Sequence, residues 1–109
     1  FATASGSAQT RVYFKADGNV GIGTGSPDYK LQVDGDIVPE SDNTDGLGTS
    51  ALRWANLYVA DAHYSNVGTG GNDVDGTEGS WTIQEGEDDL FLLNRKNGKK
   101  YKFKLEVVK

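Results

Sequence analysis

Large apolar side chains are scarce in this sequence, and that scarcity limits what one copy of the chain can fold into. Leu, Val, Ile and Phe make up 24 of the 109 residues, while glycine accounts for 15. This apolar share is close to the ~20% below which a chain seldom buries enough surface to offset the entropy lost on folding. Chains with too few apolar residues for a hydrophobic core are usually stabilised by disulfides, by a bound metal or by association between copies. The chain has no cysteine and a single histidine, His63, so self-association is the remaining source of stability.

The alternation of apolar and polar residues predicts β-strands along the chain, and no window has the period of a long helix. The predicted fold class is therefore all-β, with short strands and hairpins. One helical turn is expected at 50–54, with Ser50 as its cap. Strands are expected at residues 10–16, 20–22, 29–33, 36–38, 57–59, 81–83, 90–95 and 100–107. A monomeric β-sandwich is the structural alternative to an assembly.

Glycine, asparagine and aspartate mark the expected turns. Gly21 and Gly23 alternate with apolar residues, which lets a second backbone approach closely. Asn97-Gly98 is the favoured pair of a two-residue type I′ hairpin. In the strand after it, one face carries Tyr101, Phe103, Leu105 and Val107, and the other carries Lys100, Lys102 and Lys104. Residues 68–79 have the composition of the most flexible loop.

The net charge and the length of the apolar stretches disfavour several classes of function. The net charge is -5, which disfavours nucleic acid as a partner. The last 15 residues carry seven of the 11 basic residues and one acid, a net +6, and the first 94 carry -11. No stretch approaches the ~20 apolar residues of a membrane span, so membrane insertion is not predicted. The sequence has no methionine, so the chain is expected to be part of a longer protein, with residue 1 preceded by other residues.

Four groups of residues have the composition of a chemical site. The acidic group at 85–89 suits a carboxylate pair, but is expected to be a solvated turn that faces the lysines. Residues 72–78 lack the ligand spacing of a calcium loop, and Gly18, Gly21 and Gly23 lack the helix that a phosphate cradle needs. Three copies of His63 on a trimer axis are a further metal hypothesis. We predict no enzyme activity, no metal and no cofactor.

Aromatic side chains and polar loops are the remaining candidates. Trp54 and Trp81 are expected to be packing anchors because a buried indole contributes several kcal/mol, roughly. Arg53 is expected to pair with Asp42 or Asp45. The predicted anchors are Arg53, Trp54, Tyr58, Trp81 and Phe103. The predicted display or contact residues are Asp42, Asn43, Asp45, Asn72, Asp73 and Asp75.

Three segments of the chain resemble phage tail fibres. Residues 17–37 contain DGNVGIGT, Ser26-Pro27 and YKLQVDGDI, and are similar to a recurring segment of these fibres and of related trimeric adhesins. Residues 42–58 contain the loop DNTDGLG followed by LRWANLY, and are similar to a segment common in fibre stems. Residues 81–90, with the hairpin arm 99–105, look like the end of structural proteins from marine phages.

The resemblance implies a homotrimer with intertwined, β-prism-like strands that acts in virion structure or host attachment. It implies a location on the virion. The implied partners are further copies of the chain, other tail proteins and a host surface glycan or protein. The domain division that follows is a lead-in at 1–16, a fibre-like β region at 17–79 and a C-terminal hairpin module at 80–109. A connector or decoration protein without receptor binding is the functional alternative.

Overall fold

A computed structural model describes residues 11–109, and the first ten residues of the predicted lead-in at 1–16 lie outside these residues. The chain divides into two compact units, Phe1–Leu52 and Arg53–Lys109, which are described separately. Seven strands form two sheets and residues 11–109 contain no helix, so the all-β class is confirmed. Within the same residues, no segment is a helix long and apolar enough to cross a membrane.

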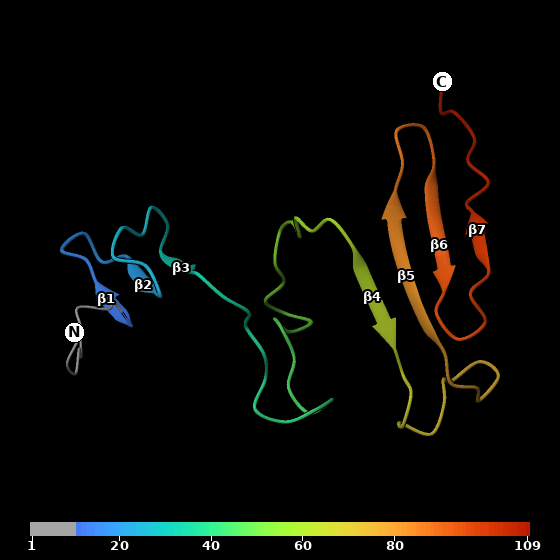
Figure 1. Ribbon diagram of the computed structural model, residues 1–109, viewed down its shortest axis with the longest axis horizontal. Coiled ribbons are helices and arrows are strands. Elements are labelled where there is room, and N and C mark those ends of the chain that lie inside the picture. Colours follow the sequence, from blue (N-terminus) through green and yellow to red (C-terminus); the bar gives the residue numbers. More distant parts are fainter. Residues whose placement is uncertain (1–10) are drawn as a thin grey trace. The chain divides into compact units, whose positions relative to one another are not determined.

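The first unit holds a sheet of three short strands, β1 (Val12–Phe14), β2 (Val20–Ile22) and β3 (Leu31–Val33). Strand β2 lies in the middle, antiparallel to β1 and parallel to β3 (Figure 1). These strands confirm the positions predicted at 10–16, 20–22 and 29–33. Three strands of this length are marginal as an independent sheet.

Gly21 explains why glycine is needed in β2. It is buried, and a Cβ atom at this position would collide with the Thr24 carbonyl oxygen and lie 3.3 Å from Pro27 Cγ. A Cβ at Gly23 would lie 3.0 Å from the Asp34 carbonyl oxygen. The predicted close approach of a second backbone is therefore confirmed.

The second unit holds an antiparallel meander of four strands in chain order. They are β4 (Ala62–Ser65), β5 (Ser80–Glu85), β6 (Leu90–Asn94) and β7 (Lys100–Lys102). Figure 1 shows them side by side, with β4 and β7 at the two edges. The register pairs Ile83 with Ala62 and with Leu92, and Leu92 with Tyr101, so these side chains share one face.

The turn between β6 and β7 differs from the predicted type I′ hairpin. Such a turn needs positive φ at both Asn97 and Gly98, but only Gly98 has it, at 76°. The loop is longer: Asn94 N–H donates to the Lys99 carbonyl, and Gly98 N–H donates to the Asn94 carbonyl. Side chains favour this loop, because Asn94 Oδ1 accepts the N–H groups of Lys96 and Asn97. The register moves by two residues, so the predicted faces are kept.

Strand β7 is shorter than the predicted strand at 100–107. The Phe103 N–H still donates to the Leu90 carbonyl, at 3.0 Å. Beyond that point the neighbouring chain is the turn at 86–89, because β6 begins at Leu90. Residues 104–107 therefore have no strand of their own sheet to pair with, although their apolar and polar residues still alternate.

Residues 34–61 contain no strand and no helix, and all of them are exposed. The strands predicted at 36–38 and 57–59 are wrong, and the strand near the second is β4, which begins at Ala62, three residues after Val59, where β5 supplies a neighbour. The helical turn at 50–54 is also wrong. Thr49, not Ser50, is the residue whose side chain binds a later N–H: its Oγ1 accepts from Leu52, while Thr49 N–H donates to the Leu52 carbonyl.

A hydrophobic core is missing from residues 11–109. None of their hydrophobic side chains is buried, and the largest fully buried side chains are Thr82 and Pro27. The exposed apolar side chains include Ile37, Val38, Leu47, Leu52, Trp54, Leu57, Tyr58 and Val59. Apolar surface of this extent is unusual for a monomeric soluble protein.

Candidate functional site

The loop between β4 and β5 is the most highly organised polar surface of the second unit. Glu78 Oε2 accepts the N–H groups of Gly68, at 2.8 Å, and Gly70, at 3.0 Å. Asn66 spans the base of the loop: its Oδ1 accepts from Gly79 N–H and its Nδ2 donates to the Thr77 carbonyl. The prediction of a flexible loop from composition overlooked these hydrogen bonds.

Asn72 and Asp75 organise the tip of the same loop. Asn72 Oδ1 accepts the N–H groups of Val74 and Asp75, and its Nδ2 donates to Asp75 Oδ1 and to the Thr77 carbonyl. Asp75 Oδ1 also accepts from Thr77 N–H and Oγ1. The oxygens that resemble calcium ligands therefore act as turn caps. In residues 11–109, no three His, Cys, Asp or Glu side chains are grouped to hold a metal.

Gly71→Ala is expected to disrupt this loop, whereas Gly70→Ala serves as its control. Both glycines have positive φ, 107° and 98°, so alanine is strained at either position. Only at Gly71 would the new Cβ collide with a backbone atom, the Gly76 carbonyl oxygen; at Gly70 it meets open space. We expect Gly71→Ala to cost about 1–3 kcal/mol more in unfolding free energy than Gly70→Ala. Equal costs in denaturant titrations would contradict the steric argument.

Acid is expected to weaken the loop through Glu78. Hydrogen bonds from the Gly70 and Gly68 N–H groups hold the pKa of Glu78 below its ordinary value of 4.5. A carboxyl with a lowered folded-state pKa stabilises the fold above its unfolded pKa, and this contribution is lost as pH falls through the folded value. NMR should show the Gly68 and Gly70 amide resonances shifting together at a midpoint below 4.5. Glu78→Gln should abolish the shift; its persistence in that variant would contradict the assignment.

The same chemistry applies at Asp75, where hydrogen bonds from the Thr77 side chain and backbone and from Asn72 lower the pKa of the carboxyl. Its protonation would remove an acceptor from the tip of the loop over a similarly acidic range.

The turn at 41–45 lies in the first unit and carries Asp42, Asn43 and Asp45. Thr44 Oγ1 donates to the Ser41 carbonyl, at 3.0 Å, and contacts Asp45 Oδ2, at 3.2 Å. Asn43 has φ of 55° and is the one non-glycine residue of positive φ within residues 11–109. Pairing of Arg53 with Asp42 or Asp45 would join the two units and stays a prediction.

A polar cluster on one face of the second sheet was not predicted. Thr82 is 0% exposed, and its Oγ1 accepts from Arg95 Nε at 2.9 Å and lies 2.8 Å from His63 Nδ1. With the hydroxyl proton directed at Nδ1, the His63 ring carries its own proton on Nε2. The alternation along β5 places Thr82 on the opposite face of the sheet from Trp81 and Ile83. The sequence does not reveal its hydrogen-bond partners, because His63 and Arg95 lie 19 and 13 residues away from it.

Thr82→Val is expected to lower the unfolding free energy by about 1–2 kcal/mol, because it removes both hydrogen bonds at a fully buried position while keeping the shape. Thr82→Ser keeps the hydroxyl and should retain the two bonds. If thermal unfolding shows that Thr82→Ser destabilises the protein as much as Thr82→Val does, the two hydrogen bonds are not the source of the stability.

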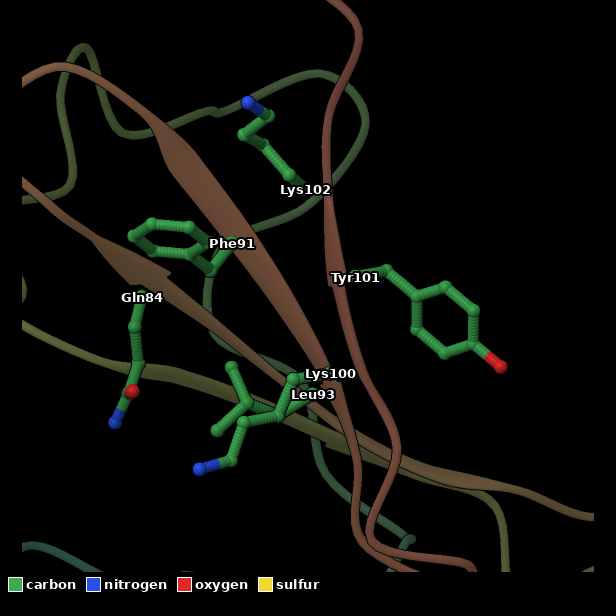
Figure 2. A pocket seen from close by; sticks show the side chains of 6 residues that line it. All are labelled: Gln84, Phe91, Leu93, Lys100, Tyr101 and Lys102. Carbon is green, nitrogen blue, oxygen red and sulfur yellow. The ribbon is translucent and has the colours of Figure 1, made fainter.

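Lys100 and Lys102 border a shallow depression of about 340 Å³ on the same face as Thr82. It is lined by Gln84, Phe91, Leu93, Lys100, Tyr101 and Lys102 (Figure 2). Lys100 and Lys102 lie directly opposite Leu93 and Phe91 in the register. Lys102 Nζ also lies 3.9 Å from Asp89 Oδ1, which agrees with a solvated acidic turn that faces the lysines.

The predicted anchors fall into two groups. Trp54 is 68% exposed and Tyr58 90% exposed, and Arg53 is exposed too, so none of the three is packed within its own unit. Trp81 and Phe103 are half-buried. The Trp81 ring lies 5.7 Å from the Tyr101 ring, tilted by 43°.

Comparison with protein-family models, with curated proteins and with solved structures finds no match.

Proposed function

We propose that this chain is a structural segment of a phage virion fibre, a tail fibre or spike, in which three copies form a shaft or tip that contributes to host attachment. Its partners are two further copies of itself and other tail proteins, and its place is the surface of the virion. The role is mechanical and adhesive, and no catalytic step is assigned to it.

The surface left exposed by one copy is the observation that carries the proposal. Among residues 11–109 no hydrophobic side chain is buried, and large apolar side chains such as Ile37, Leu52 and Trp54 are more than two thirds exposed. A monomeric soluble protein rarely leaves so much apolar surface uncovered, so this exposure supports a chain that meets neighbouring copies.

The exposed apolar residues coincide with the segment of closest fibre resemblance. Residues 42–58 resemble a fibre-stem segment, and they include Leu47, Leu52, Trp54, Leu57 and Tyr58, all of which are exposed. Because these apolar side chains are exposed in a single copy, they support the proposal that another copy buries this surface. The polar loops at 41–45 and 66–79, held by their own hydrogen bonds, supply surface for display.

The mass of the purified 109-residue chain in solution tests the proposal. Sedimentation equilibrium is expected to give three times the chain mass of 11.7 kDa. A stably folded species at the mass of one copy would contradict it. Antibodies against residues 72–75 should label the tail of intact virions. Binding of the isolated trimer to host cells would distinguish an attachment segment from a connector or decoration protein.

A further inference from the structure

We infer that one face of the β4–β7 sheet is the surface on which a second copy of this chain packs. The inference rests on the proposed self-association and deepens it by naming the surface. The register places one set of side chains on this face, which we call the apolar face. Its aromatic and large apolar members include Tyr64, Trp81, Ile83, Leu92, Tyr101 and Phe103, and Glu85 lies at its edge, where β5 ends.

Side chains of the opposite face have partners within the chain. Thr82 at its centre is covered and bonded to His63 and Arg95. Lys100 and Lys102 flank Leu93 and Phe91, and lysine stems cover apolar surface while their charges stay in water. Figure 2 shows the Tyr101 side chain directed away from Gln84, Phe91 and Leu93, toward the other face.

The apolar face is not covered within its sheet. Tyr64 is 61% exposed and Tyr101 45% exposed, and the other members are only half-buried. The Trp81 and Tyr101 rings, 5.7 Å apart, form a paired aromatic surface. A Cβ atom at Gly79 would lie 3.0 Å from Trp81 Nε1, so the indole lies against the backbone there. Aromatic side chains already held in place are typical of the residues that dominate binding energy.

The chemistry of this face fits another copy of the chain. Every copy carries a net charge of -5, so copies repel wherever acidic surfaces meet. None of the six side chains named above is charged, and Glu85, the acid of this face, lies at the end of β5, so two copies can meet over the centre of the face without placing like charges in contact.

The end of β7 extends the same face beyond its own sheet. Leu105 and Val107 continue the alternation of Tyr101 and Phe103 and are largely exposed. No strand of this sheet lies beside them, because β6 begins at Leu90. A neighbouring copy that packs on the apolar face would cover them as well.

Leu92→Lys and Leu93→Lys form a matched pair for the test, because these half-buried neighbours in β6 point to opposite faces. Sedimentation equilibrium of each full-length variant is the measurement. Leu92→Lys should weaken association at least about a hundredfold, since it places three ammonium groups in an apolar contact, while Leu93→Lys stays trimeric. An associated Leu92→Lys variant, or equal dissociation of both, would overturn the assignment.

Single cysteines give a second readout that does not depend on dissociation, because the chain has no cysteine of its own. In the assembly, maleimide should label the Leu92→Cys thiol at least about tenfold more slowly than the Leu93→Cys thiol. Equal rates in a trimer would overturn the face while leaving the proposed function intact. Protection of the Leu92→Cys thiol in a chain with the mass of one copy would overturn both, because the chain would then cover itself.

Discussion

Trp81→Ala is expected to lower the unfolding free energy of the assembled protein by about 3 kcal/mol or more. The substitution removes the indole that lies 5.7 Å from the Tyr101 ring and against Gly79. It also removes the largest side chain of the apolar face, which a second copy would cover. Thermal unfolding should show a decrease of about 10 °C or more.

Trp81→Phe is the control for this experiment, because it keeps an aromatic ring on the same face and should retain most of the stability. Phe91→Leu, on the opposite face of the sheet, controls for the loss of an aromatic ring in general. If Trp81→Ala melts within 2 °C or so of the unchanged chain, the ring pair does not stabilise the assembly.

Trp54→Ala is expected to weaken the assembly without altering either sheet. Trp54 is 68% exposed and lies outside every strand, so one copy loses few contacts of its own. If the neighbouring copy covers Trp54, the assembly loses the stability contributed by a buried indole, about 3 kcal/mol. Sedimentation should then show the variant dissociating at a higher protein concentration than the unchanged chain. Circular dichroism of the concentrated variant should keep its β signal.

The outcome that contradicts packing at Trp54 is specific. A variant that keeps its melting temperature and its mass but loses binding to host cells would make Trp54 a receptor contact instead. Val74→Ala, at a 96% exposed position in the β4–β5 loop, is the control for substitution of an exposed apolar residue and should change neither property.

The period-2 alternation predicted the well-defined strands because it is a local property. Residues 81–83 lie on β5, and residues 90–94 of the strand predicted at 90–95 form β6. The prediction that Gly21 allows a close backbone approach was also correct, because a Cβ atom at this position would collide with the Thr24 carbonyl oxygen.

The failures share one cause, which is that a strand needs a neighbour. Residues 36–38 and 57–59 have strand composition but lie beside no strand, and 104–107 lose theirs where β6 begins. Asn97-Gly98 favours a two-residue turn, but a longer loop forms instead, because the Asn94 side chain accepts two N–H groups of that loop. Composition does not reveal such pairing.

The sequence alone therefore determined the all-β class, the apolar and polar faces of the C-terminal strands, and a supply of large apolar residues too small for a closed core. These properties depend on residue type and on a two-residue period. Only the tertiary structure decided that Thr82 lies buried between His63 and Arg95, that Glu78 binds the backbone of its loop, and where each strand ends. Those outcomes depend on which distant residues come together, because hydrogen bonds across 8 to 19 residues form only once the sheet has set its register.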